Sequence, residues 1–162
     1  MWIRTVDRDD LQNIRDLLVK TWHATYDDIY GKDRVNAINE DWHSVKALQK
    51  RMTRPYSEFV IADDGTEILG VAYASMGDER IAYLHQLYVN PDAQGRGAGK
   101  ALLIEMESAF PMAAKMRLEV EEANAKAIAF YENQGYRQVD RTDNCGSRDS
   151  GIPALILEKQ IG

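Results

Sequence analysis

The chain has 162 residues, of which 44% are hydrophobic and 28% are charged, and its formal net charge at pH 7 is −6. This composition is typical of a globular protein that buries one core, so we expect a single domain over residues 1–162. The acidic balance disfavours nucleic acid or an anionic membrane as the main partner, and no apolar run is long enough to span a membrane.

The first third of the chain predicts one strand followed by two helices with a connection between them. Asp9 or Asp10 is a suitable N-cap, and the apolar residues that follow recur at the three- and four-residue spacing of a helix. The connection is polar and contains Gly31, a residue type that interrupts helices. In chain order, these elements are a strand over residues 3–6, a helix from Leu11 to Trp22, the connection over residues 26–39, and a helix begun by Asp41 and ended by Pro55.

The middle of the chain predicts three strands. Residues 59–62 and 68–75 would pair across Asp63-Asp64-Gly65, which is a strong hairpin turn. A third strand over residues 83–89 is rich in aromatic and β-branched side chains, and Asn90-Pro91-Asp92 would end it.

The most informative feature is the run Gln94-Gly95-Arg96-Gly97-Ala98-Gly99, which lies between that strand and an apolar helix. The first N–H groups of a helix have no partner within the helix and lie at the positive end of its dipole. Glycines allow a phosphate to approach this backbone closely. The run therefore predicts an anion-binding loop, and a pyrophosphate is the anion that suits it best.

Two other phosphate-binding motifs fit this run poorly. A P-loop needs Ser or Thr after its Gly-Lys pair, whereas Gly99-Lys100 is followed by Ala101. A dinucleotide-binding turn has Gly-x-Gly-x-x-Gly spacing and an acidic strand end downstream, and neither is present here. The remaining alternative is a tightly packed helix entry that binds no ligand.

A second motif begins at Asn124 and reads Asn-x-x-Ala-x-x-Phe-Tyr-Glu-x-x-Gly-Tyr. Asn124 would cap a helix over residues 125–134, and Gly135 would end that helix in a left-handed conformation. Strands are predicted on both sides of the helix, over residues 116–120, 136–140 and 154–158. Cys145 lies in a polar stretch that predicts an exposed loop, and a single cysteine excludes an internal disulfide and a cysteine metal cluster.

The two motifs occur in an order and at a separation that resemble the GCN5-related N-acetyltransferases (GNAT), in detail over residues 57–140. The resemblance implies an α/β (α+β) fold with a mixed, mostly antiparallel sheet, splayed central strands and helices on both faces. It also implies an enzyme that moves the acetyl group of acetyl-CoA to a primary amine, of a small molecule in the first instance, by direct attack in a ternary complex. The alternatives are a protein N-terminal acetyltransferase of the ribosomal-protein type and a non-catalytic acyl-CoA-binding module.

The resemblance further implies that acetyl-CoA is held by main-chain groups of a bulged strand and by the glycine-rich run. Asn124 would hydrogen bond near the pantetheine, or serve only as a helix cap. Arg96 and Lys100 could neutralise phosphates, although single surface cations contribute little. The residues assigned to acetyl-CoA are Leu87, Tyr88, Val89, Gln94, Gly95, Arg96, Gly97, Ala98, Gly99, Lys100, Asn124 and Tyr131.

Three side chains are candidates for catalysis. By resemblance, Tyr131 would be the general acid for the coenzyme thiolate, the other interpretation being aromatic packing. Glu119 is matched by a glutamate that acts through water in the protein N-terminal branch, whereas His85 offers the chemistry of a neutral-pH base. We rank the two about level, and the amine could also lose its proton in solution.

The expected partners are acetyl-CoA and an amine, with a homodimer as a further option and no metal, nucleic acid or membrane. A cytoplasmic location is the default expectation for such a chain. The net charge would suit a cationic amine, but many proteins are mildly acidic for solubility alone. The sequence does not identify the acceptor.

Overall fold

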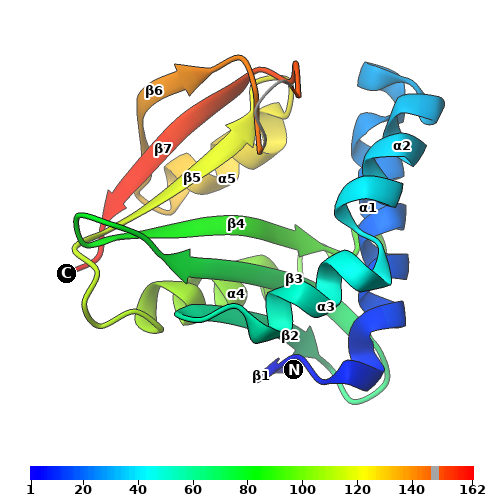
Figure 1. Cartoon of the computed structure of the whole chain (residues 1–162), viewed down its shortest axis with the longest axis horizontal. Coiled ribbons are helices and arrows are strands. Elements are labelled where there is room, and N and C mark those ends of the chain that lie inside the picture. The colour runs from blue at the N-terminus through cyan, green and yellow to red at the C-terminus, as the bar shows by residue number, and fades with distance from the viewer. Residues whose placement is uncertain (147–149) are drawn as a thin grey trace. The chain divides into compact units, whose positions relative to one another are not determined.

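The structure is a computed structural model that describes residues 1–146 and 150–162. Its seven strands follow the order β1-β2-β3-β4-β5-β7-β6 in one mostly antiparallel sheet, and helices flank the sheet (Figure 1). The strands are β1 Trp2–Thr5, β2 Ser57–Asp63, β3 Ile68–Met76, β4 Ile81–Val89, β5 Lys115–Glu121, β6 Arg137–Thr142 and β7 Ala154–Gln160. The helices are α1 Leu11–Tyr30, α2 Lys32–Trp42, α3 Val45–Thr53, α4 Ala98–Ser108 and α5 Ala125–Asn133, with short 3-10 turns η1 Arg8–Asp10 and η2 Pro91–Ala93.

The chain forms two compact units, and each is discontinuous in sequence. The first unit comprises residues 1–74 and 86–109, and the second comprises residues 75–85 and 110–162. The chain passes from one unit to the other within β3 and again within β4. The predicted mixed fold with helices on a mostly antiparallel sheet is confirmed.

In the first unit, helices cover both faces of the strands. Phe59 and Ile61 of β2 join a core cluster with Leu48 of α3 and apolar side chains of α1. Since side chains alternate along a strand, the intervening residues of β2 face the other way, toward α4. Gly70 of β3 also faces α4, because a Cβ built on it would lie only 2.9 Å from Leu102 Cδ1.

The second unit contains the parallel part of the sheet. The parallel ladder between β4 and β5 pairs Ile81–Leu84 with Lys115–Leu118. β5 is also antiparallel to β7, from Lys115 opposite Gln160 to Glu121 opposite Ala154. β6 pairs with β7 and has a register shift between Gln138 and Asp140.

The prediction of two N-terminal helices is wrong, because the described chain has three there. The stretch taken for a connection is helical on both sides of Gly31, whose φ of 86° ends α1 at Tyr30 and allows α2 to begin at Lys32. This stretch is helical because Val35 and aromatic side chains of α1 and α2 pack together in a second core cluster. Asp41 belongs to α2, and α3 is instead capped by Ser44, whose hydroxyl accepts the Ala47 N–H at 3.1 Å.

The prediction that Cys145 lies in an exposed loop is also wrong, because its side chain is buried and only 6% exposed. The Cys145 N–H donates to the Ile152 carbonyl at 2.8 Å, and this bond holds the residue against the unit. Over residues 1–146 and 150–162, no helix combines the length and apolar character needed to cross a bilayer. Among those same residues, no group of three or more His, Cys, Asp or Glu could hold a metal ion.

Candidate active site

The glycine-rich run forms the entry to α4, in the first unit. Gly95 and Gly97 have φ of 87° and 82°, and Gly97 is the left-handed N-cap of the helix. A Cβ added at either glycine would meet no protein atom within 4 Å, so the backbone conformation requires glycine and crowding does not. Among residues 1–146 and 150–162, no side chain caps α4, which leaves its first N–H groups available to an anion. The loop therefore fits the pyrophosphate of a coenzyme.

The two cations beside this loop contribute little to the binding of an anion. Arg96 lies near Asp64, with 3.4 Å between Nη2 and Oδ2, and its side chain is about half exposed. Lys100 is exposed on the first turn of α4. Because both groups are solvated, the loop depends mainly on its main-chain donors for an anion.

The end of β4 carries the three residues assigned to the pantetheine arm. Tyr88 packs against both core clusters of the first unit, with its ring centroid 6.3 Å from that of Trp22. Leu87 and Val89 flank it and are half-buried. The partly buried Tyr88 side chain therefore helps to fix the position of this strand end.

In the second unit, Asn124 and Tyr131 belong to the same helix. Asn124 caps α5 as predicted, because its Oδ1 accepts the Ala127 N–H at 3.1 Å. Tyr131 is 8% exposed, and its ring lies edge-on to Phe130 and Tyr136, at centroid distances of 5.3 and 5.7 Å. Burial, and then the nearby Glu121 carboxylate, raise the pKa of Tyr131 well above its usual value. The phenol therefore keeps its proton over the whole working range of pH.

Two carboxylates of β5, those of Glu119 and Glu121, lie near the Cys145 loop. Glu119 is exposed, and its Oε2 accepts the Gly146 N–H at 2.7 Å. Glu121 is 7% exposed, with its Oε1 3.9 Å from Cys145 Sγ. Burial and these two carboxylates raise the pKa of the Cys145 thiol, so it stays protonated and unreactive.

Glu121 is the residue that the sequence interpretation missed. Its neighbour Glu122 is a solvated charge that pairs with Arg141 at 3.1 Å. Glu121 instead ends a buried strand immediately before the Asn124 turn, and this position at a strand end was the available signal. The Glu121 carboxylate adds to the effect of burial in raising the pKa of the Tyr131 phenol.

All three histidines have a polar partner; His43 pairs with Asn39 in the core of the first unit, while His85 and His23 lie in different units. His85 Nε2 lies 2.7 Å from Ser75 Oγ, and its exposed ring stacks with Tyr83. In the first unit, His23 Nδ1 lies 2.6 Å from Asp27 Oδ1, one turn further along α1. The i and i+4 spacing would have revealed this second pair in the sequence.

Comparison with known proteins agrees with this arrangement. Residues 26–154 match the acetyltransferase (GNAT) domain family. The chain is 25% identical over 147 residues to the spermidine N(1)-acetyltransferase of Thermoplasma acidophilum, covering 87% of this chain and 90% of that protein. It is 29% identical over 128 residues to the N-alpha-acetyltransferase RimI of Mycobacterium tuberculosis, covering 77% of this chain and 80% of that one.

Solved structures share the fold. The paiA N-acetyltransferase from Thermoplasma acidophilum, in complex with coenzyme A, superposes with a TM-score of 0.85 at 23% identity over 98% of both chains. The ribosomal-protein-alanine N-acetyltransferase from Brucella melitensis gives 0.73 at 23% identity over 99% of both chains. The family match covers well over half of the residues of this chain. The chain therefore belongs to the acetyltransferase (GNAT) domain family and is an acetyl-CoA-dependent N-acetyltransferase.

Proposed function

We propose that the protein acetylates a primary amine of a small cationic molecule. The observation that carries this proposal is the acidic stretch at the end of α1 and along α2. Residues 27–41 contain five carboxylates and two cations, so this stretch attracts positive charge. The similarity to a spermidine acetyltransferase over most of both chains supports the same class of acceptor.

We assign the binding of the donor to main-chain groups. The N–H groups of residues 95–99, in the loop before α4 and in its first turn, bind the pyrophosphate, and the main chain of Leu87–Val89 pairs with the pantetheine amides. Acetyl-CoA supplies the electrophilic thioester carbonyl. The residues around it hold the donor in place, so that the amine attacks without a covalent enzyme intermediate.

We assign the two proton transfers to side chains of the second unit. Tyr131 donates a proton to the departing thiolate, a role supported by the burial that keeps the phenol protonated. Glu119 accepts the proton of the attacking ammonium through a water molecule. Its exposed carboxylate is held in place by the Gly146 N–H, which supports this role over that of His85, the alternative base.

The acceptor class is tested by comparing two amines in one thiol-release assay. We expect kcat/KM for spermidine to exceed that for a short peptide with N-terminal alanine by at least about tenfold, because the acidic stretch favours a multiply charged amine. Mass spectrometry of the products confirms which amine was acetylated. A preference for the peptide would instead support the protein N-terminal acetyltransferase, the class to which the similar RimI enzyme belongs. A cytoplasmic location and a homodimer stay predictions.

A further inference from the structure

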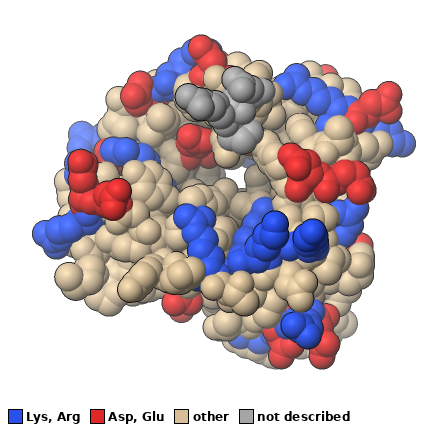
Figure 2. Space-filling model, in the orientation of Figure 1, with Lys and Arg blue, Asp and Glu red and all other residues tan. Residues whose placement is uncertain are grey.

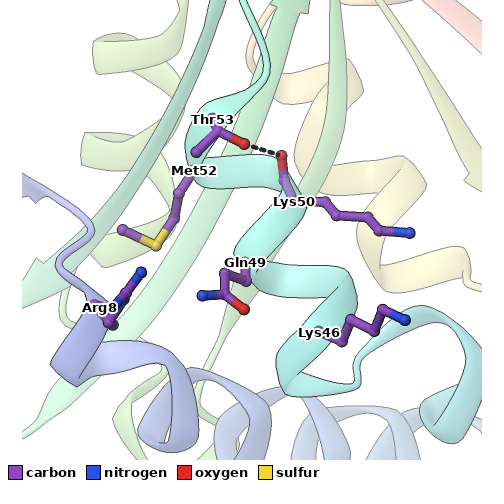
Figure 3. A pocket seen from close by; sticks show the side chains of 6 residues that line it. All are labelled: Arg8, Lys46, Gln49, Lys50, Met52 and Thr53. Carbon is purple, nitrogen blue, oxygen red and sulfur yellow. Dashed lines mark hydrogen bonds between the residues drawn. The ribbon is translucent and has the colours of Figure 1, made fainter.

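A pocket of about 400 Å³ lies beside α3 in the first unit (Figure 3). Its lining comes from η1 and α3 and consists of Arg8, Lys46, Gln49, Lys50, Met52 and Thr53. Leu48 of α3 packs with Phe59 and Ile61 of β2, so α3 covers the face of β2 opposite α4. The pocket is therefore separate from the glycine-rich loop at the start of α4, and its volume is in the range of small-ligand sites.

The lining carries three positive charges and no carboxylate. Arg4, Arg15, Lys20 and Arg96 of the same unit each form a salt bridge. In the part of the chain that the structure describes, the three cations of the pocket form no salt bridge. This concentration of unpaired charge stands out in a chain whose net charge is −6. Figure 2 shows Lys and Arg side chains gathered on the face that carries α3.

The backbone that carries these groups is well anchored. Leu48 is fully buried, Met52 packs against the core, and Ser44 caps the helix, so α3 holds its side chains at fixed spacing. Lys46 and Lys50 are four residues apart and extend from the same side of α3. Figure 3 places Gln49 and Met52 between these lysines and Arg8.

We propose that this pocket binds a small phosphorylated molecule, at a second site distinct from the acetyl-CoA site. A guanidinium and two ammonium groups match the charge of a phosphate or diphosphate, and ammonium groups on flexible stems can adjust to it. The Gln49 amide adds a neutral donor, and the Met52 thioether offers an apolar wall to the rest of the ligand. An extended polyanion is less suited, because the acidic remainder of the chain repels it.

Titration with inorganic pyrophosphate tests the proposal, with coenzyme A present in excess so that the glycine-rich loop is occupied. Heat of binding gives the affinity, and the side-chain amide resonance of Gln49 reports whether the anion enters the pocket. In the Lys46→Gln/Lys50→Gln double variant, we expect affinity to fall by at least about tenfold, because two charge-assisted contacts are removed. The matched control is Lys32→Gln/Arg137→Gln, which removes the same charge from exposed positions outside the pocket.

The control variant should bind pyrophosphate within about twofold of the unmodified protein, because neither changed residue lines the pocket. Equal weakening in both double variants would show attraction to net charge alone and would overturn the proposal. So would the absence of binding to the unmodified protein, or a Gln49 resonance that does not move. Tighter binding of single-stranded RNA or of anionic phospholipid vesicles, lost in the pocket variant, would also overturn it in favour of a macromolecular polyanion.

Discussion

At the scale of the residue, Tyr131 is the side chain whose environment bears most directly on the chemistry. Tyr131→Phe keeps the ring and its packing but removes the proton donor, so turnover should fall by roughly ten- to a thousandfold. Coenzyme A affinity, measured by calorimetry, should remain constant. An equal loss of affinity and turnover would return the residue to a packing role.

The raised pKa of Tyr131 also predicts the form of the pH–rate profile. A general acid stops working when it loses its proton, and burial moves that loss above the ordinary phenol value of about 10. The rate of the unmodified enzyme should therefore show no decline attributable to a phenol up to pH 10. A decline between pH 8 and 10 that Tyr131→Phe abolishes would contradict this.

His43 makes a separate prediction about stability in acid. Its ring is fully buried, and burial with the charges of Arg51 and Arg15 lowers its pKa from 6.5 to about 3. The unfolded chain binds this proton at higher pH than the folded one. The resulting stability is fully present above pH 6.5 and is lost as the pH falls from 6.5 toward 3.

The variant His43→Gln removes this titration, which can be followed by urea unfolding between pH 7 and pH 4. The advantage of the unmodified protein over the variant should shrink by up to about 3 kcal/mol over that interval. Other acid-sensitive groups, such as Asp10 with its lowered pKa, act equally in both proteins. Parallel stability curves would show that the buried ring does not drive the loss.

At the scale of the element, the glycine-rich entry to α4 makes a prediction about coenzyme binding. Gly97→Ala puts a methyl group where no protein atom lies but where a phosphate would approach, so coenzyme A binding should weaken at least about tenfold. Gly65→Ala is the control, because Gly65 also has a positive φ and its Cβ would make an ordinary contact with Trp2. Both variants carry backbone strain, so only a loss of affinity confined to Gly97→Ala supports the loop assignment.

Elements with local signals were predictable from the sequence. The hairpin at Asp63-Asp64-Gly65, the cap at Asn124 and the left-handed Gly135 depend on residues within a few positions of each other. The helical structure on both sides of Gly31 was not predictable in this way. It depends on Trp22, Tyr26 and Val35 burying one another across two helices, which no short window of sequence records.

The candidate site also has one part that the sequence predicts and one part that it does not. The glycine run was predictable because few residue types other than glycine adopt a positive φ and leave the backbone N–H groups accessible at a helix entry. The burial of Glu121 and Cys145 was not, because both belong to surroundings assembled from β5 and a loop more than twenty residues further on. Sequence patterns report the chemistry of a side chain, whereas its protonation depends on what packs over it.

At the scale of the whole molecule, we infer that the two compact units form one domain, as the sequence predicts. The support is that β3 and β4 each run through both units, so no linker divides them. Cutting the chain at either crossing would leave half a strand in each piece. We would expect neither unit to fold when produced separately.

The strand order of the second unit has a consequence for synthesis on the ribosome. β7 lies between β5 and β6, although both of those strands precede it in the chain. Until residue 160 has emerged, β5 lacks its antiparallel neighbour and β6 has no strand to join. The nascent chain therefore exposes unpaired strand edges after every residue of the first unit has been synthesised, and we expect it to be most prone to misassembly in this interval.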